Sequence, residues 1–553
     1  MFDYSKLNQA IPGFRGARRS ALLAVTICSM PLALAVTPAA QAAVPADASI
    51  LNQIGATQLA AMHPNLNGAG VVVAQVEAGG NNFEADPNAV AQPTAGLLTY
   101  INSTGASSTT YSSAAGSGHA NMVGNFFYGG AGYGVAAGVA HVYNYNSSYF
   151  LRDVVGGNST NTPVLPAPST AGAVANPTPP TADGDAPPIP AKVVNQSFII
   201  TPSANSPMTP VPETYYNIQY DNYTDLYGTI FVSGVGDGTY TQTFPNSEIN
   251  PPATAYNSIA VGAYGGQTGV GPTTDGRSKP DIVAPGSATS YTTALVSGAA
   301  TLLVQAGSRG TGYSAGDGFT PSTYATAATD ERTIKALLLN GAVKPAGWSQ
   351  TYTNAVGGTQ TGALDPRYGA GVLNVYNSYQ QLAAGREAPT STGTGVSGGA
   401  EKSAVGWDFN TISTASQVNT YEFNLAAVPS GSSYTLTTTL VWNVGLTPYD
   451  GMQSLNNLQL QLFGPNGQLI GASASLVDNV QELYLQNLTA GQYNLVVTGI
   501  PGGVFGAATP YALAFNFQDP AGPSVPEPSV LALLAAGMAL PLLKRLHRNK
   551  CVS

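Results

Sequence analysis

The sequence predicts an α/β domain with a mainly parallel sheet flanked by helices, followed by an antiparallel β-sandwich of jelly-roll type. Two observations carry this prediction. From about residue 47 to 385, apolar runs typical of buried strands alternate with helical stretches. Beyond residue 402 the helical pattern disappears, and Leu458, Leu460 and Leu462 alternate with glutamines before a Pro-Asn-Gly turn.

The elements of the first domain follow from the same patterns. Strands are expected at 70–76, 139–145, 193–198, 229–233 and 258–263, and helices at 119–127, 291–305 and 331–342. Residues 157–190, rich in Pro, Thr and Ala, are expected to form a loop between two strands. The whole chain divides into 1–42, 43–385, a linker at 386–402, a β-sandwich at 403–519, and 520–553.

Composition excludes several classes of protein. The 553 residues include 19 Lys plus Arg against 28 Asp plus Glu, a net charge of -9. With so few Lys and Arg residues, the chain offers no basic surface that could neutralise the phosphates of a nucleic acid. A content of 8 % charged residues also excludes a coiled coil and an acidic disordered protein. The two cysteines, Cys28 and Cys551, lie in the two end segments that we expect processing to remove, so we expect the mature protein to have no thiol, no disulfide and no thiolate metal site.

The first 42 residues have the order of a secretory signal peptide. Three arginines precede an apolar run at 21–36, and Ala40-Gln41-Ala42 supplies small residues for cleavage. We therefore expect export and processing by signal peptidase.

The last residues carry a second targeting pattern. Pro526-Glu527-Pro528 precedes a short apolar tail at 529–543, and a basic cluster follows. This order resembles the PEP-CTERM sorting signal of Gram-negative bacteria, which implies a transient membrane anchor that an exosortase removes at the cell surface or matrix. A plain tail anchor is the alternative.

Three segments place a chemically useful side chain at a strand end or a helix start. Glu77 ends a buried strand, His119 lies in the first turn of an apolar helix, and Ser290 lies at a helix N-terminus. Each alone has an ordinary explanation, as a paired carboxylate, a helix-start hydrogen bonder or a helix cap. Their joint occurrence in the order acid, His, Ser favours nucleophilic catalysis.

This order and its flanks resemble the subtilisin-like serine peptidases, or subtilases, over residues 66 to about 380. The supporting strings are VVNQS at 193–197, FVSGVGDG at 231–238, KPDIVAPG at 279–286 and YGAGVLN at 368–374. The resemblance implies a subtilisin-like sheet and peptide-bond hydrolysis. It implies that Ser290 is the nucleophile, His119 the general base and Glu77 the residue that orients His119.

The same resemblance assigns the substrate-binding positions. Asp237 stands where the family has an oxyanion-hole Asn, and Gln196, Ser197 and Gly234 border the substrate groove. An ionised Asp237 cannot donate a hydrogen bond to the oxyanion. Protonation at acid pH would restore donation, so the sequence predicts an acid-shifted optimum.

No cofactor is expected. Many subtilases bind calcium, but the acids here are sparse, and no metal site is assigned. A nucleotide site is excluded because the glycines at 68 and 70 precede the first strand instead of following it.

The leading hypothesis is an exported serine endopeptidase acting on proteins or peptides at the cell surface. The alternative is a catalytically silent subtilase fold that serves as a surface binding or matrix protein, since Asp237 and Glu77 depart from the family pattern.

Overall fold

The computed structural model describes residues 48–78, 80–156, 189–200, 213–238, 248–308, 325–353, 358–393, 401–446 and 453–519, all within one compact unit. The predicted signal peptide, the sorting signal and most of the loop at 157–190 lie outside these residues. Within the described ranges, no helix is long and apolar enough to cross a membrane. The predicted tail at 529–543 is not among the residues to which this finding applies.

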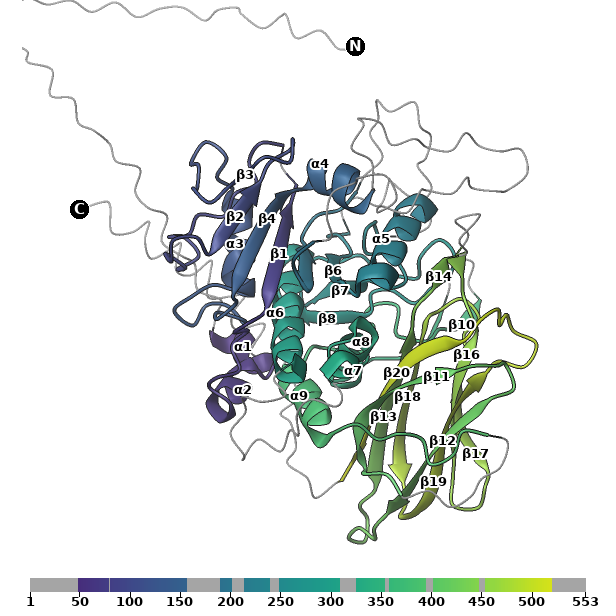
Figure 1. Ribbon diagram of the computed structural model, residues 1–553. Helices are drawn as coiled ribbons and strands as arrows, with labels where there is room; N and C mark the ends of the chain where they lie inside the picture. The colour runs from purple at the N-terminus through teal and green to yellow at the C-terminus, as the bar shows by residue number, and fades with distance from the viewer. Residues whose placement is uncertain are drawn as a thin grey trace, which may run out of the picture. The chain divides into compact units, whose positions relative to one another are not determined.

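A sheet of eight strands forms the centre of the first domain (Figure 1), in the order β3-β2-β4-β1-β5-β6-β7-β8. All neighbouring strands are parallel except β2 and β3. The strands are β1 Val72–Glu77, β2 Leu98–Ile101, β3 Ser107–Ser108, β4 His141–Asn146, β5 Val193–Gln196, β6 Ile230–Gly234, β7 Ile259–Tyr264 and β8 Ile282–Pro285.

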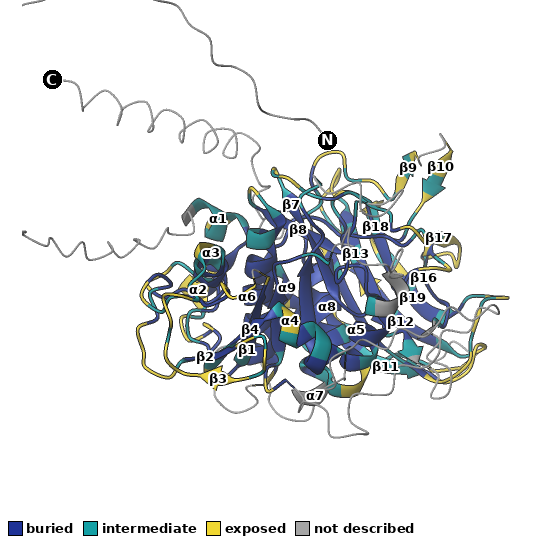
Figure 2. Ribbon diagram, turned by 90° about the horizontal axis from the view of Figure 1, so that it is seen from above, coloured by how far each residue is buried: buried dark blue, intermediate teal, exposed yellow. Residues whose placement is uncertain are grey.

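Helices lie on both faces of this sheet (Figure 1). The bounds are α1 Ala48–Gln53, α2 Ala56–Met62, α3 Gly118–Phe127, α4 Ser147–Tyr149 with the π-helix η1 Phe150–Val155, α5 Glu213–Tyr227, α6 Thr289–Ser308, α7 Ala325–Ala328, α8 Glu331–Asn340 and α9 Val375–Ala384. A hairpin, β9 Thr351–Thr353 with β10 Thr359–Thr361, extends from the domain and is largely exposed, as is β3 (Figure 2).

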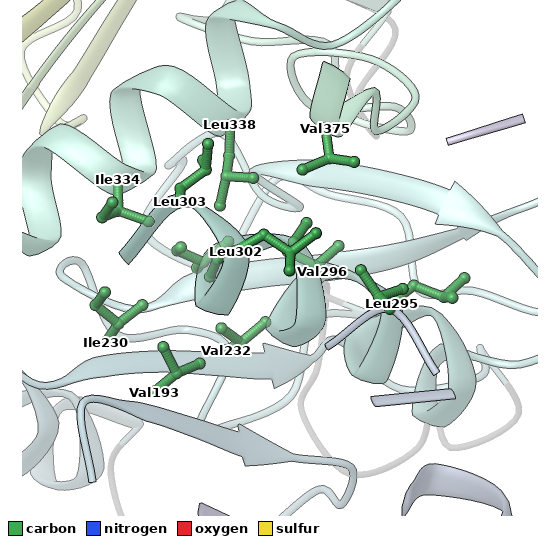
Figure 3. Close-up of a cluster of buried hydrophobic side chains, with 14 of the residues drawn as sticks. Val193, Ile230, Val232, Leu295, Val296, Leu302, Leu303, Ile334, Leu338 and Val375 are labelled. Carbon is green, nitrogen blue, oxygen red and sulfur yellow. The ribbon is translucent and has the colours of Figure 1, made fainter. Parts of the chain in front are cut away.

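Alternation along the strands explains the two layers of the core, because successive side chains point to opposite faces. Val193 and Val232 pack with Val296 of α6 and with α8 and α9 on one face (Figure 3). Their neighbours Val194 and Phe231 pack with tyrosines of α5 on the other face. The central helix α6 is buried along almost its whole length, and only its ends are partly exposed.

The second domain is an eight-stranded β-sandwich with the sheets β11-β20-β13-β18 and β12-β19-β16-β17. Numbered within the domain, these orders read 1-8-3-6 and 2-7-4-5, the jelly-roll arrangement. The strands are β11 Val405–Ile412, β12 Val418–Leu425, β13 Tyr434–Trp442, β16 Leu458–Phe463, β17 Leu469–Ser473, β18 Val480–Leu488, β19 Gly491–Gly499 and β20 Thr509–Gln518, with a small pair, β14 Gly445–Leu446 and β15 Gln453–Ser454. The predicted fold class is confirmed for both domains.

The two domains share a hydrophobic core. Leu440 and Trp442 face the interior of the sandwich, whereas Val441 between them belongs to the core of the first domain. The indole N–H of Trp407 in β11 donates to the carbonyl of Leu382 in α9 at 3.1 Å. Part of the predicted linker also pairs with the sandwich, through bridges of Arg386 and Ser391.

Candidate active site

The expected site residues gather at the carboxyl edge of the parallel sheet. Glu77 is the last residue of β1, Ser197 directly follows β5, and Gly234 ends β6. Strand β1 lies between β4 and β5, so these strand ends are neighbours in space. In open α/β sheets this edge is where ligands bind.

Glu77 and His119 form a hydrogen-bonded pair. Helix α3 starts after Ser117, whose hydroxyl caps it by accepting the N–H of Ala120 at 3.2 Å, and this places His119 in the first turn. His119 Nδ1 lies 2.7 Å from Glu77 Oε2, and the Glu77 side chain is fully buried whereas that of His119 is 40 % exposed. The imidazole is therefore fixed by the buried Glu77 through Nδ1, while another part of the ring remains exposed to solvent.

The pKa of His119 is raised above its ordinary value. Burial alone lowers it, but the hydrogen bond to Glu77 and the negative charges of Glu77 and Asp237 together outweigh burial. Asp237, in the loop after β6, therefore adds to the effect of Glu77 on the pKa of His119.

Ser290 lies in the first turn of α6, at the partly exposed end of this buried helix. The Ser197 hydroxyl donates to the Ser290 carbonyl at 2.8 Å, and Ser290 Oγ donates to the Ser197 carbonyl at 3.4 Å. Next to Ser290, the ring of Tyr291 lies 6.4 Å from the His119 ring. Among the described residues, Ser290 and His119 make no hydrogen bond with each other, and the Ser290 hydroxyl is bonded to the carbonyl of Ser197, just after β5, instead.

Asp237 is bonded to the start of α6. Its Oδ1 accepts both the backbone N–H and the hydroxyl of Thr289, each at 2.8 Å. The flanking Gly236 and Gly238 have φ of 99° and 69°, values that favour glycine and turn the loop back toward α6. In this arrangement Asp237 acts as a hydrogen-bond acceptor, and it brings a carboxylate to the helix end that favours negative charge.

A pocket of about 170 Å³ opens between these segments. Its lining comprises Ser197, Phe198, Ile199, Gly234, Gly236, Asp237, Thr289 and Ser290. The structure thus brings the expected residues Ser197, Gly234, Asp237 and Ser290 together around one cavity.

The expectation that Gln196 borders this groove needs correction. Its side chain is fully buried on the α5 face, where Nε2 donates to the Tyr220 hydroxyl at 2.5 Å and Oε1 accepts from the Ser233 hydroxyl at 2.8 Å. Because side chains alternate along a strand, Gln196 faces away from the side that Ser197 faces.

Two residues of the site escaped the sequence analysis. Thr289 donates a hydrogen bond to Asp237, which lies 52 positions earlier in the chain. Its role in the site can be predicted only when this contact is already known. Gln75 donates a hydrogen bond to Glu77 Oε1 at 2.8 Å. The sequence does mark this residue, because it is polar, lies within an otherwise apolar strand and stands two positions before Glu77.

No group of three or more His, Cys, Asp or Glu residues in the described ranges is placed to hold a metal.

The sheet with α3 and α6 on one face is a subtilisin-like α/β fold. Residues 68–371, more than half of the chain, match the model of the subtilase family. The chain therefore belongs to the subtilase family, which supports a serine peptidase-type function with protein substrates.

Other comparisons describe only distant likeness. No curated protein matches the chain in sequence. The A-subunit of the AB5 toxin from E. coli is 14 % identical, with a TM-score of 0.33 over 60 % of this chain and 99 % of that chain. The lysozyme inhibitor PliG of Aeromonas hydrophila is 18 % identical, with a TM-score of 0.14 over 21 % of this chain and 87 % of that one. We draw no functional inference from these structures.

Proposed function

We propose that the protein is an exported serine endopeptidase that hydrolyses peptide bonds through Ser290, His119 and Glu77. The proposal is carried by the 2.7 Å hydrogen bond between His119 Nδ1 and the fully buried Glu77 carboxylate, beside the helix end that bears Ser290. A buried carboxylate that holds an imidazole is the arrangement that nucleophilic catalysis by serine requires.

The bond to Glu77 decides the role of each ring nitrogen. Because Nδ1 faces Glu77, Nε2 is the nitrogen that accepts the proton of Ser290. Rotation of the Ser290 side chain away from the Ser197 carbonyl precedes attack on the substrate carbonyl. His119 then gives the proton to the leaving amine, and water releases the acyl group from Ser290. The negative charge of Glu77 stabilises the imidazolium in both steps.

The oxyanion would have one good donor, the N–H of Ser290, which lies among the N–H groups of α6 that lack a partner within the helix. At the position of the second donor, Asp237 accepts hydrogen bonds from Thr289 and adds a negative charge. Since losing one such donor typically costs about 10²- to 10³-fold in rate, we expect slow turnover at neutral pH. The raised pKa of His119 acts against the acid optimum that the sequence predicts, because the imidazole can no longer accept a proton once the pH falls below that pKa.

The alternative function, a catalytically silent surface protein, is favoured by the same two observations. Ser290 Oγ is bonded to Ser197, and Asp237 is an acceptor where the reaction needs a donor. In that case the pocket would serve binding alone.

Labelling by a fluorophosphonate probe separates the two functions. The purified full-length protein is exposed to the probe between pH 4 and pH 8, with Ser290→Ala as the negative control. Ser287→Ala, which changes an exposed serine three positions away, should keep the label. Labelling that disappears only in Ser290→Ala supports the peptidase, and no labelling at any pH supports the silent protein.

The proposed location rests on the sequence alone. Signal peptidase would remove residues 1–42, and an exosortase would cleave near Pro526-Glu527-Pro528 after residues 529–543 have held the chain in the membrane. Mass spectrometry of the protein recovered from the cell surface tests both cleavages.

A further inference from the structure

The Glu77 carboxylate is held on both of its oxygens. Oε2 faces His119 Nδ1 at 2.7 Å, and Oε1 accepts a hydrogen bond from Gln75 Nε2 at 2.8 Å. Gln75 and Glu77 are two positions apart in β1, so their side chains lie on the same face of the sheet. A glutamate has one more rotatable bond than an aspartate, and the amide of Gln75 restrains that extra freedom.

The same amide also reaches the helix that carries the imidazole. Gln75 Nε2 donates its second hydrogen to the carbonyl of Ala120 at 2.9 Å, and Ala120 directly follows His119 in α3. One side chain therefore bonds the carboxylate on the strand and the backbone beside the histidine.

Tyr128 fixes which way this amide points. The Tyr128 hydroxyl donates to Gln75 Oε1 at 2.6 Å, so the NH₂ group must face Glu77. The side chains of Gln75, Glu77 and Tyr128 are all fully buried. Water does not compete for these hydrogen bonds, which form a chain from Tyr128 through Gln75 and Glu77 to His119.

We infer that Gln75, oriented by Tyr128, is a positioning residue for the reaction, and that it sets the orientation and the basicity of His119 through Glu77. The inference rests on the proposed function. Its direct readout, the titration of His119, does not require turnover.

The expected effects follow from the charge on Glu77. The Gln75 amide stabilises this charge, so its loss strengthens the pull of Glu77 on the His119 proton and raises the pKa of His119 further. In Gln75→Met, which keeps the length of the side chain, kcat should fall about 10- to 100-fold with little change in KM, as expected for a lost hydrogen bond to a charged group. Tyr128→Phe should shift the titration in the same direction by less.

The titration of His119 is measured by NMR of its ring in Ser290→Ala protein. The control is Gln92→Met. Gln92 is also a buried glutamine, but it donates to the backbone carbonyls of Tyr128 and Ala137, at 2.7 and 2.8 Å, and not to Glu77. Gln75→Met and Tyr128→Phe should raise the pKa of His119, and Gln92→Met should leave it unchanged.

An unchanged titration in folded Gln75→Met would overturn the inference, and so would an equal shift in Gln92→Met. If Gln75→Met does not fold, Tyr128→Phe decides by the same criterion. If the pKa of His119 shifts as expected but the protein is never labelled by the fluorophosphonate probe, the proposed peptidase function is refuted, whereas the positioning role of Gln75 is supported. Labelling without the shift would refute the positioning alone.

Discussion

Asp237 Oδ1 accepts two hydrogen bonds from Thr289, one from its backbone N–H and one from its hydroxyl. These bonds hold a carboxylate at the N-terminus of α6, one residue before Ser290. Beside Ser290, the proposed nucleophile, the site therefore carries a negatively charged group that accepts hydrogen bonds.

Asp237→Asn should raise the rate of probe labelling near neutral pH by about 10²- to 10³-fold, because the amide can donate to the oxyanion. It should also move the acid limb of the pH profile to lower pH, since one of the charges that raise the pKa of His119 is removed. The pH profile of labelling measures both effects. Glu422→Gln, which removes a charge in the β-sandwich, should change neither, and a profile of Asp237→Asn identical to that of the parent would refute this account.

Glu77→Gln should lower the rate about 10⁴-fold, because the carboxylate that orients and stabilises His119 is lost. The pKa of His119 should fall, since burial still lowers it while the bond and charge of Glu77 no longer raise it. Labelling kinetics and NMR titration check the two effects. Glu84→Gln changes another buried glutamate, whose Oε2 accepts the N–H of Ser112, and should leave both quantities unaltered.

Much of this arrangement could be predicted from the sequence. The apolar runs located β1, β5, β6 and β7 and the helices α3, α6 and α8 to within a few residues. Helix α5 was not expected, because its tyrosines and polar residues give no clear apolar stripe, although they pack against the sheet.

Contacts between distant segments were harder to predict. The hydrophobic pattern indicates that Gln196 lies in β5. It does not indicate which face of the sheet the side chain occupies, because β5 is buried on both faces, and Gln196 in fact faces α5. The acceptor role of Asp237 depends on the position of Thr289, which the fold brings near from 52 residues away. The sequence therefore predicted the positions of these polar groups better than their partners.

A buried ion pair between the domains should contribute to stability. Lys344, which follows α8, pairs with Glu482 of β18, and their side chains are only 6 % and 0 % exposed. Lys344→Met leaves the Glu482 carboxylate buried without its cation and should lower the free energy of unfolding by about 3–5 kcal/mol. Urea unfolding measures the loss. The double variant Lys344→Met/Glu482→Leu should recover part of it, and a double variant as unstable as the single one would contradict this explanation.

Asp221 of α5 should make stability depend on pH. Burial raises the pKa of Asp221 to about 6, although the N–H of Asn257 donates to it at 2.7 Å. Between its unfolded value of 3.8 and about 6, the folded protein holds a proton that the unfolded chain has lost, so stability falls as pH rises through this window. Asp221 should contribute about 3 kcal/mol to this decline.

Asp221→Asn keeps an oxygen acceptor but does not titrate, so the decline should be smaller than in the parent by about 3 kcal/mol. Urea unfolding at pH 4 and pH 7 tests this. Asp225→Asn, at an exposed position of the same helix, should retain the parent's decline. Equal declines in Asp221→Asn and in the parent would show that another group is responsible.

The alternation of Leu440, Val441 and Trp442 between two cores limits how this molecule can be divided or rebuilt. A gene fragment that stops near residue 393 would leave Leu382 and the apolar sides of α8 and α9 without the strands that cover them. The β-sandwich therefore cannot be exchanged like an independent module: a replacement would have to supply an outer sheet face that matches the peptidase half, as well as a stable interior of its own.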